Sequence, residues 1–324
     1  MKYLKRIMAL ALACLIVISL VPPTRVSAAS GNAVTFLTNN GILRGFGGGN
    51  LGLEQNLTRE QFVMYLHRVA GEPAVQGYSR FTDVQIGADY YDAVLWAQKK
   101  EITNGVSTTR FGVGSYLTYE QVLTFLYRFG NSIFGTSHSN MKKGSVPKGY
   151  TNYNSSGKCP EMLDALAWAY YKKLLTGTNT TNIKVGTNVC TRGDAVQLIY
   201  NFYKAFRKTY ALAACTNDAY DGMGNPNPGL MSTLFNNYLT HGKTVLKGTG
   251  ATINSKTQLK AAFKEAFSNA TCIDVCYFYI NSHGGPGAGL TDKELNTWLS
   301  TSDLKKLVDS YPAKFVIMIE ACYS

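Results

Sequence analysis

The sequence is poor in negative charge and, beyond its first 21 residues, has no long hydrophobic run. It holds 20 acidic residues against 32 basic ones, which gives a formal net charge of +12. Without a second long apolar stretch, the chain is expected to be soluble or wall-associated rather than membrane-spanning. Aromatic–basic motifs for nucleic acid are missing, and so are His and Cys residues at metal-ligand spacing. We therefore expect no nucleic acid, metal or cofactor among its partners.

Residues 1–29 have the features of a secretory signal peptide. Three basic residues lie in the first six positions, an apolar run of 15 residues spans Ile7 to Val21, and small residues lead up to Ala29. Cleavage there removes four positive charges and no negative ones, so +12 becomes +8. We expect a secreted chain with no membrane contact after cleavage. For a basic secreted protein, an anionic wall polymer is the more plausible partner.

A single pattern occurs three times in the first two-thirds of the chain. In each repeat, an alanine is followed by a threonine that precedes a second helix-like stretch. The two residues are 25 positions apart in the first and second repeats and 26 apart in the third. The alanine–threonine pairs are Ala33 and Thr58, Ala93 and Thr118, and Ala165 and Thr191. The threonine suits a helix N-cap, and the polar residues after it suit the first turn. The pattern predicts three helix–loop–helix repeats, at about residues 31–71, 80–130 and 158–206.

These repeats resemble S-layer homology (SLH) repeats. The resemblance rests on Phe81-Thr82-Asp83-Val84, on Thr58-Arg59-Glu60-Gln61, and on a Trp followed by a Gly-containing loop. It implies that residues 30–206 form a three-pronged helical module that binds anionic secondary cell-wall polysaccharide at the surface of a bacterium. The arginine of the family's Thr-Arg-Ala-Glu string corresponds to Arg59 and Arg192, which are the expected polymer-binding residues. The alternative is that these are surface arginines balancing Glu60 or Asp194.

The second repeat departs from the family pattern because Tyr119 replaces the arginine. This puts the second groove in doubt. Six cysteines remain after the signal segment, an even number that permits disulfides outside the cell. Cys159 and Cys190 bracket the third repeat and are the expected pair, whereas Cys272 and Cys276 are expected in the core.

Residues 207–324 alternate between strand-like and helix-like segments, which predicts a partial α/β domain with a mainly parallel sheet. Strands are expected at 209–215, 241–246, 273–280 and 314–319, and helices at 231–239, 255–267 and 295–308. The last two strands are rich in β-branched and aromatic residues, as parallel strands covered on both faces are. One is followed by His283-Gly284 and the other by Glu320-Ala321-Cys322.

A His and a Cys at the carboxyl ends of neighbouring parallel strands would meet at one edge of the sheet. This arrangement resembles the dyad of caspase-like (clan CD) cysteine peptidases, the group that includes legumains and metacaspases. The resemblance implies that Cys322 is the nucleophile and His283 the general acid. It also implies that backbone N–H groups at Gly284 and Cys322 hold the oxyanion. The substrate would be a peptide or protein.

Glu320 would lie beside the substrate pocket and favour cleavage after Asn, Arg or Lys over Asp. Asn217-Asp218-Ala219 resembles a metacaspase string whose Asp recognises basic residues, although Asp218 is equally well a turn residue. Family members continue past the nucleophile, whereas this sequence stops at Ser324, so we expect an incomplete domain with weak or no activity. The sequence therefore predicts a wall-anchored cysteine peptidase. The alternative is a non-catalytic surface protein with the same anchor.

Overall fold

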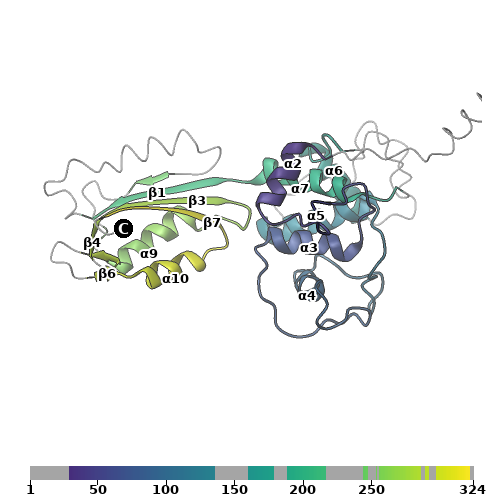
Figure 1. Ribbon diagram of the computed structural model, residues 1–324, viewed down its shortest axis with the longest axis horizontal. Coiled ribbons are helices and arrows are strands. Elements are labelled where there is room, and N and C mark those ends of the chain that lie inside the picture. Colours follow the sequence, from purple (N-terminus) through teal and green to yellow (C-terminus); the bar gives the residue numbers. More distant parts are fainter. Residues whose placement is uncertain are drawn as a thin grey trace, which may run out of the picture.

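The computed structural model describes residues 29–135, 160–178, 188–216, 244–246, 253, 255–285, 289–291 and 297–321. A helical region and an α/β region follow one another along the chain and lie side by side (Figure 1). The predicted signal segment and the predicted helix at 231–239 lie outside the described residues. In the described part of the chain, no helix combines the length and hydrophobicity needed to cross a membrane.

The helical region consists of three helix pairs, one for each predicted repeat. In order along the chain, the helices are α2 (Gly31–Asn39), α3 (Arg59–Val69), α4 (Tyr91–Lys99), α5 (Tyr119–Phe134), α6 (Pro160–Tyr171) and α7 (Arg192–Phe206). We call the pairs repeats 1, 2 and 3. Each second helix starts after the predicted threonine. Thr58, for example, accepts the Gln61 N–H while its own N–H donates to the Gln61 side chain, a local arrangement that stabilises the helix start.

The three repeats are joined by a closed ring of backbone hydrogen bonds. Leu57 N donates to Cys190 O (2.9 Å), Cys190 N to Leu117 O (2.8 Å), and Leu117 N to Leu57 O (2.9 Å). Each of these residues immediately precedes the N-cap threonine of its repeat. Helix α3 packs on α4, α5 on α6, and α7 returns to α2. The second helix of each repeat thus contacts the first helix of the next, and the ring closes with approximate threefold symmetry.

One hydrophobic core runs through all three repeats. Phe62, Phe129 and Phe202, each from the second helix of its repeat, are completely buried in it. Trp168 of α6 is also fully buried and packs against Tyr127 of α5 and against Phe202 and Phe206 of α7. Because repeat 3 shares this core, it is an integral part of the helical region.

The α/β region is built on a parallel sheet with the strand order β2-β1-β3-β7. The strands are β1 (Thr209–Cys215), the short β2 (Thr244–Leu246), β3 (Val275–Asn281) and β7 (Lys314–Glu320). Helices α9 (Lys256–Phe267) and α10 (Thr301–Asp309) lie against the same face of the sheet (Figure 1), where Phe263 of α9 contacts Phe278 and Phe315. The predicted parallel arrangement and these strand positions are confirmed.

Two predictions about this region are wrong. Within the segment expected to be helical (295–308), residues Thr297–Leu299 form strand β6, and the described helix starts at Thr301. Ser300 sets this start, because its hydroxyl accepts the Asp303 N–H (3.1 Å) as an N-cap. Strand β6 joins β4 (His283–Gly285) and β5 (Gly289–Thr291) in a small antiparallel sheet.

Strand β7 is not covered on both faces as predicted. It is the last strand of the sheet, and Val316, Ile317 and Ile319 are each 38–42% exposed. The α/β region also touches the helical region. Cys272 and Ile273 join the helical core, and Lys314 Nζ donates to Asn40 Oδ1 (2.8 Å).

Candidate functional site

Arg59 is the first residue of α3 and inserts its guanidinium into repeat 2. Its Nε donates to Phe111 O (2.9 Å), and the guanidinium carbon lies 5.2 Å from the Phe111 ring centroid and 5.0 Å from that of Phe125. The residue is 4% exposed. Burial, with the nearby charge of Arg128, lowers its pKa to about 10, so it still carries its charge at neutral pH. The aromatic faces stabilise that charge in place of water.

Arg192 is the first residue of α7 and inserts in the same way into repeat 1. Its Nε donates to Leu51 O (3.1 Å) and its Nη2 to Arg44 O (3.0 Å). The guanidinium carbon lies 4.6 Å from the ring centroid of Phe46 and 5.6 Å from that of Tyr65. Phe46 is 56% exposed, so one face of this site borders solvent. Arg59 and Arg192 therefore occupy equivalent boundaries between repeats.

The third boundary has Tyr119 in place of the arginine. Its N–H donates to Asn188 O (3.3 Å), as Arg59 N does to Ser115 O and Arg192 N to Gln55 O. The backbone geometry is thus repeated at all three boundaries. The segment 179–187 of repeat 3, which corresponds to the loop that receives Arg59, lies outside the described residues.

Arg59 and Arg192 are buried, at 4% and 3% exposed, and do not lie on the surface as the alternative interpretation of the sequence requires. Glu60 accepts the Gly114 N–H (3.0 Å). Asp194 accepts the hydroxyl of Thr191, the N-cap residue of α7 (2.6 Å). Neither Nη atom of Arg59 has a hydrogen-bond partner among the described residues. An acid group entering this boundary would therefore find two donors in the fork geometry that suits a carboxylate.

Asp83 holds the loop that receives Arg59. Its carboxylate accepts the N–H groups of Phe111 (2.8 Å), Gly112 (2.8 Å) and Val113 (3.1 Å). Gly112 has a φ of +92°, and a Cβ there would lie 2.8 Å from the Val106 side chain and 3.2 Å from that of Arg59. Asp83 belongs to the Phe-Thr-Asp-Val string, but the sequence alone did not assign it this role.

These three N–H bonds keep the pKa of Asp83 below its ordinary value, although burial acts to raise it. The pKa of Asp83 is lower in the folded state than in the unfolded state. The ionised carboxylate therefore stabilises the fold at pH values above its unfolded pKa of about 3.9, and this stabilisation is lost as the pH falls through its folded pKa. We expect Asp83→Ala to lower the free energy of unfolding at pH 7 by about 1–3 kcal/mol. The loss should shrink towards pH 3 in urea denaturation.

The matched control for Asp83→Ala is Asp92→Ala, which removes an exposed carboxylate from α4. It should change stability by less than about 0.5 kcal/mol. A loss for Asp83→Ala that stays constant from pH 7 to pH 3 would contradict the role given to the ionised carboxylate.

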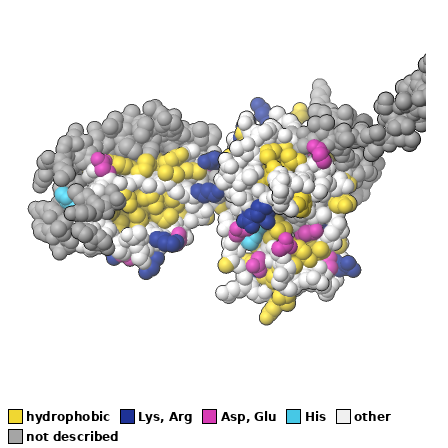
Figure 2. Space-filling view, in the orientation of Figure 1, with side chains coloured by type: hydrophobic (Ala, Val, Ile, Leu, Met, Phe, Trp, Pro, Cys, Tyr) yellow, Lys and Arg dark blue, Asp and Glu magenta, His cyan; other side chains and the backbone are white. Residues whose placement is uncertain are grey.

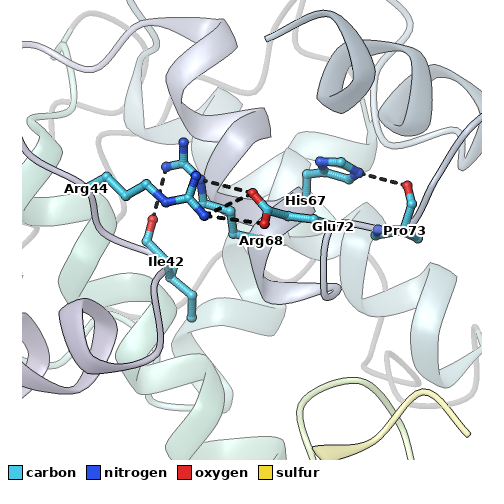
Figure 3. A network of polar contacts seen from close by, with 6 residues as sticks. All are labelled: Ile42, Arg44, His67, Arg68, Glu72 and Pro73. Carbon is cyan, nitrogen blue, oxygen red and sulfur yellow. Dashed lines mark hydrogen bonds and ion pairs between the residues drawn. The ribbon is translucent and has the colours of Figure 1, made fainter. Parts of the chain in front are cut away.

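Arg44, whose main-chain oxygen accepts from Arg192, belongs to a polar network with Arg68 and Glu72 (Figure 3). Glu72 accepts from Arg44 (3.2 Å) and lies 3.7 Å from Arg68, whose Nη1 donates to Ile42 O (3.2 Å). His67 contacts Pro73 O (3.1 Å) in the same turn. The sequence did not single out these residues as site residues. The available clue was an arginine ten positions after Thr58 and again ten positions after Thr118, which are Arg68 and Arg128. Arg128 makes the equivalent bond in repeat 2, where it donates to Ile102 O (3.4 Å).

At the carboxyl edge of the sheet, the predicted neighbouring strands end side by side. Asn281 of β3 pairs with Glu320 of β7, and Ser282 N donates to Glu320 O (3.1 Å). His283 follows at the start of β4 and is half-buried, and Gly284 is buried. Cys322 and Asp218 lie outside the described residues, so the predicted Cys322–His283 dyad stays a prediction.

The side chain of Glu320 has a partner within the sheet. Its carboxylate accepts a hydrogen bond from the Tyr279 hydroxyl. Burial, and then this bond, raise the pKa of Tyr279 well above its ordinary value, so the tyrosine stays protonated and acts as the donor. The side chain of Glu320 is therefore held in place at the carboxyl end of the sheet.

The described cysteines are buried thiols. Cys190 is a free, buried thiol, and its backbone takes part in the ring that joins the repeats, whereas the predicted Cys159–Cys190 disulfide stays a prediction. Cys159 itself lies outside the described residues. Cys272 and Cys276 are in the core, as predicted, and burial raises the pKa of each to about 12. Such thiols are unreactive at neutral pH.

The helical region thus defines a protein built from repeated helix pairs, with cationic sites at their boundaries. Residues 24–63 and 80–123 match the S-layer homology domain. The chain is therefore an SLH-domain protein, and it is located at the bacterial cell surface. SLH domains bind cell-wall polysaccharide, so the helical region anchors the chain to the wall. The match does not extend into residues 207–324, and the comparison with curated proteins finds no match.

Proposed function

We propose that residues 30–206 form one SLH module of three repeats that binds anionic secondary cell-wall polysaccharide. Residues 160–206 lie outside the two matched stretches, so the third repeat rests on geometry. The observation that carries it is the closed hydrogen-bond ring of Leu57, Leu117 and Cys190, in which repeat 3 takes the same part as repeats 1 and 2. A module closed in this way needs all three repeats.

We further propose that the polymer's acid groups bind at the Arg59 and Arg192 boundaries. Both guanidiniums are held by backbone carbonyls and aromatic rings, so they are already oriented before a ligand arrives. A preorganised fork loses little entropy on binding a carboxylate. The mature charge of +8 expected after loss of the signal segment favours the approach of a polyanion.

Sedimentation with purified cell walls tests this proposal. The full chain should sediment with walls from an SLH-bearing bacterium and remain in the supernatant with walls stripped of their secondary polysaccharide. A basic protein of similar pI without SLH repeats is the control for unspecific charge attraction. Equal sedimentation with intact and stripped walls would refute polysaccharide binding.

A second candidate function concerns the sheet edge, where we propose a caspase-like cysteine peptidase site. The observation that favours it is the register of β3 and β7, which aligns Asn281 with Glu320. His283 opens β4 two residues after Asn281, and Cys322 follows Glu320 by two residues in the sequence, so both come directly after the carboxyl ends of neighbouring strands. The Cys322 thiolate would attack the scissile carbonyl, and His283 would protonate the leaving amine.

The described part of the edge also supports the proposed preference. The Glu320 carboxylate, held by Tyr279, would repel a substrate Asp and accommodate Asn, Arg or Lys. Asp218 would add a second negative charge. Gly284 would contribute a backbone N–H to the oxyanion, together with that of Cys322. The competing proposal is a non-catalytic surface protein whose α/β region serves only as a binding or spacing unit.

Fluorogenic peptides distinguish these two alternatives. If the peptidase proposal holds, cleavage after Asn, Arg or Lys should be abolished in Cys322→Ala and nearly abolished in His283→Ala, because the two groups act as a unit. Cys272→Ala, which removes a core thiol, is the matched control and should retain the activity. Turnover that survives Cys322→Ala would exclude the proposed dyad, and no turnover in the full chain would favour the non-catalytic protein.

A further inference from the structure

A groove with basic walls lies between α9 and α10 on the outer side of the α/β region. It has a volume of about 470 Å³, within the range of ligand-binding sites. Lys256, Lys260 and Lys264 of α9 and Lys306 of α10 line it. Basic side chains gather along this edge of the α/β region (Figure 2). The groove is distant in sequence from the SLH repeats, and it is on the helix-covered face rather than at the carboxyl end of the strands.

Most of the positive charge in the groove is uncompensated. Lys256 pairs with Asp303 (2.5 Å), and this bond, with that from Ser300, lowers the pKa of Asp303 to about 2, so the carboxylate is ionised at neutral pH. Among the described residues, Lys260, Lys264 and Lys306 have no carboxylate partner. Three unpaired cations therefore surround one groove.

The lysines of α9 form a regular row. They are four residues apart, which places successive side chains on one helix face at a spacing of ~6 Å. Lys306 adds a cation from the opposite wall, and Leu307 and Tyr311 contribute apolar surface between them. A track of evenly spaced charges matches a ligand that is itself a chain of repeated anions.

We propose that this groove binds a linear phosphodiester polymer of the cell envelope, in addition to the polysaccharide bound by the SLH repeats. Lysine ammonium groups bind phosphates as point charges and make few demands on direction. An acidic peptide is the alternative occupant, and poly-L-glutamate stands for it in the binding test. The cell-surface location brings the chain close to wall-attached anionic polymers.

This proposal is independent of the other two. It needs neither a functional dyad nor the Arg59 and Arg192 contacts, and it predicts a second attachment point that would increase the overall avidity for the wall.

Binding of labelled poly(glycerol phosphate) to the full chain tests the proposal by fluorescence anisotropy. The test variant carries Lys260→Gln, Lys264→Gln and Lys306→Gln. The control carries Lys100→Gln, Lys173→Gln and Lys204→Gln, which remove the same charge from exposed positions outside the groove. We expect affinity to fall about tenfold in the test variant and less than twofold in the control, because each exposed ion pair contributes a factor of about two to three.

The dependence on salt gives a second measure. The slope of log affinity against log salt should decrease by about two in the test variant, since three fewer cations neutralise the polymer. Equal losses in the test and control variants would overturn the site, because they would indicate a general charge effect. The class of ligand would be wrong if poly-L-glutamate or phosphatidylglycerol vesicles, but not poly(glycerol phosphate), showed the lysine dependence.

Discussion

Replacing Trp168 with alanine should lower the free energy of unfolding of the helical region by about 3–5 kcal/mol. The side chain is fully buried, and its ring contacts Tyr127 of repeat 2 as well as Phe202 and Phe206 of repeat 3. Removing it leaves a cavity at the contact that attaches repeat 3 to the rest of the ring. Urea denaturation followed by circular dichroism measures the loss.

Tyr171→Ala is the matched control because it truncates a 52% exposed ring near the end of the same helix. Its effect should stay below about 0.5 kcal/mol. If repeat 3 were an appendage rather than part of a closed ring, Trp168→Ala would leave repeats 1 and 2 at full stability. A separate, unshifted transition for those repeats would contradict the closed module.

The double variant Arg59→Lys, Arg192→Lys should bind walls about 100-fold more weakly than the wild type. Lysine keeps the charge but loses the fork, and each charge-assisted contact contributes about 1.5 kcal/mol or more. Two such losses amount to about 3 kcal/mol, or a factor of about 100. Quantitative sedimentation with intact walls gives the affinity.

Because the two guanidiniums also bond to Phe111 O and Leu51 O, the double variant must be compared at a temperature where circular dichroism shows it folded. Arg80→Lys with Arg207→Lys is the control, because it makes the same chemical change at two positions outside the Arg59 and Arg192 sites. A folded double variant that binds within twofold of the wild type would exclude these arginines from the polymer site.

The helix starts of the helical region were predictable because their determinants are local. An N-cap threonine, polar residues in the first turn and apolar residues at helical spacing all lie within one segment, as at Thr58 and Gln61. The strands were equally predictable from the sequence, because runs such as Val275–Asn281 are nearly free of charged residues. The β3–β7 pairing then followed from their order along the chain.

The burial of the arginines was not predictable, because their partners come from other repeats. Phe111 and Asp83 contribute to the Arg59 site from repeat 2, and Phe46 contributes to the Arg192 site from repeat 1. Only the ring closure brings these segments together. The sequence pattern of one repeat contains no information about which loop faces its helix.

The segment after β3 was mispredicted for a different reason. Leu295, Trp298 and Leu299 occur at helical spacing, but Trp298 and Leu299 form an edge of a small sheet with β5. The N-cap at Ser300 then starts the helix later than the apolar pattern suggests. The residues of β6 could have joined the following helix, but their pairing with β5 in the small sheet of β4, β5 and β6 made them a strand. The sequence does not reveal this pairing.

Hydrogen exchange of the full chain with and without solubilised wall polysaccharide tests the central claim most directly. We expect the polysaccharide to slow exchange at the repeat boundaries, in the peptides that contain Arg44–Leu51, Arg110–Gly114 and the start of α7 at Arg192. Peptides from β3 and β7 should not change. Protection confined to residues 207–321, with none at the two arginine boundaries, would contradict the account.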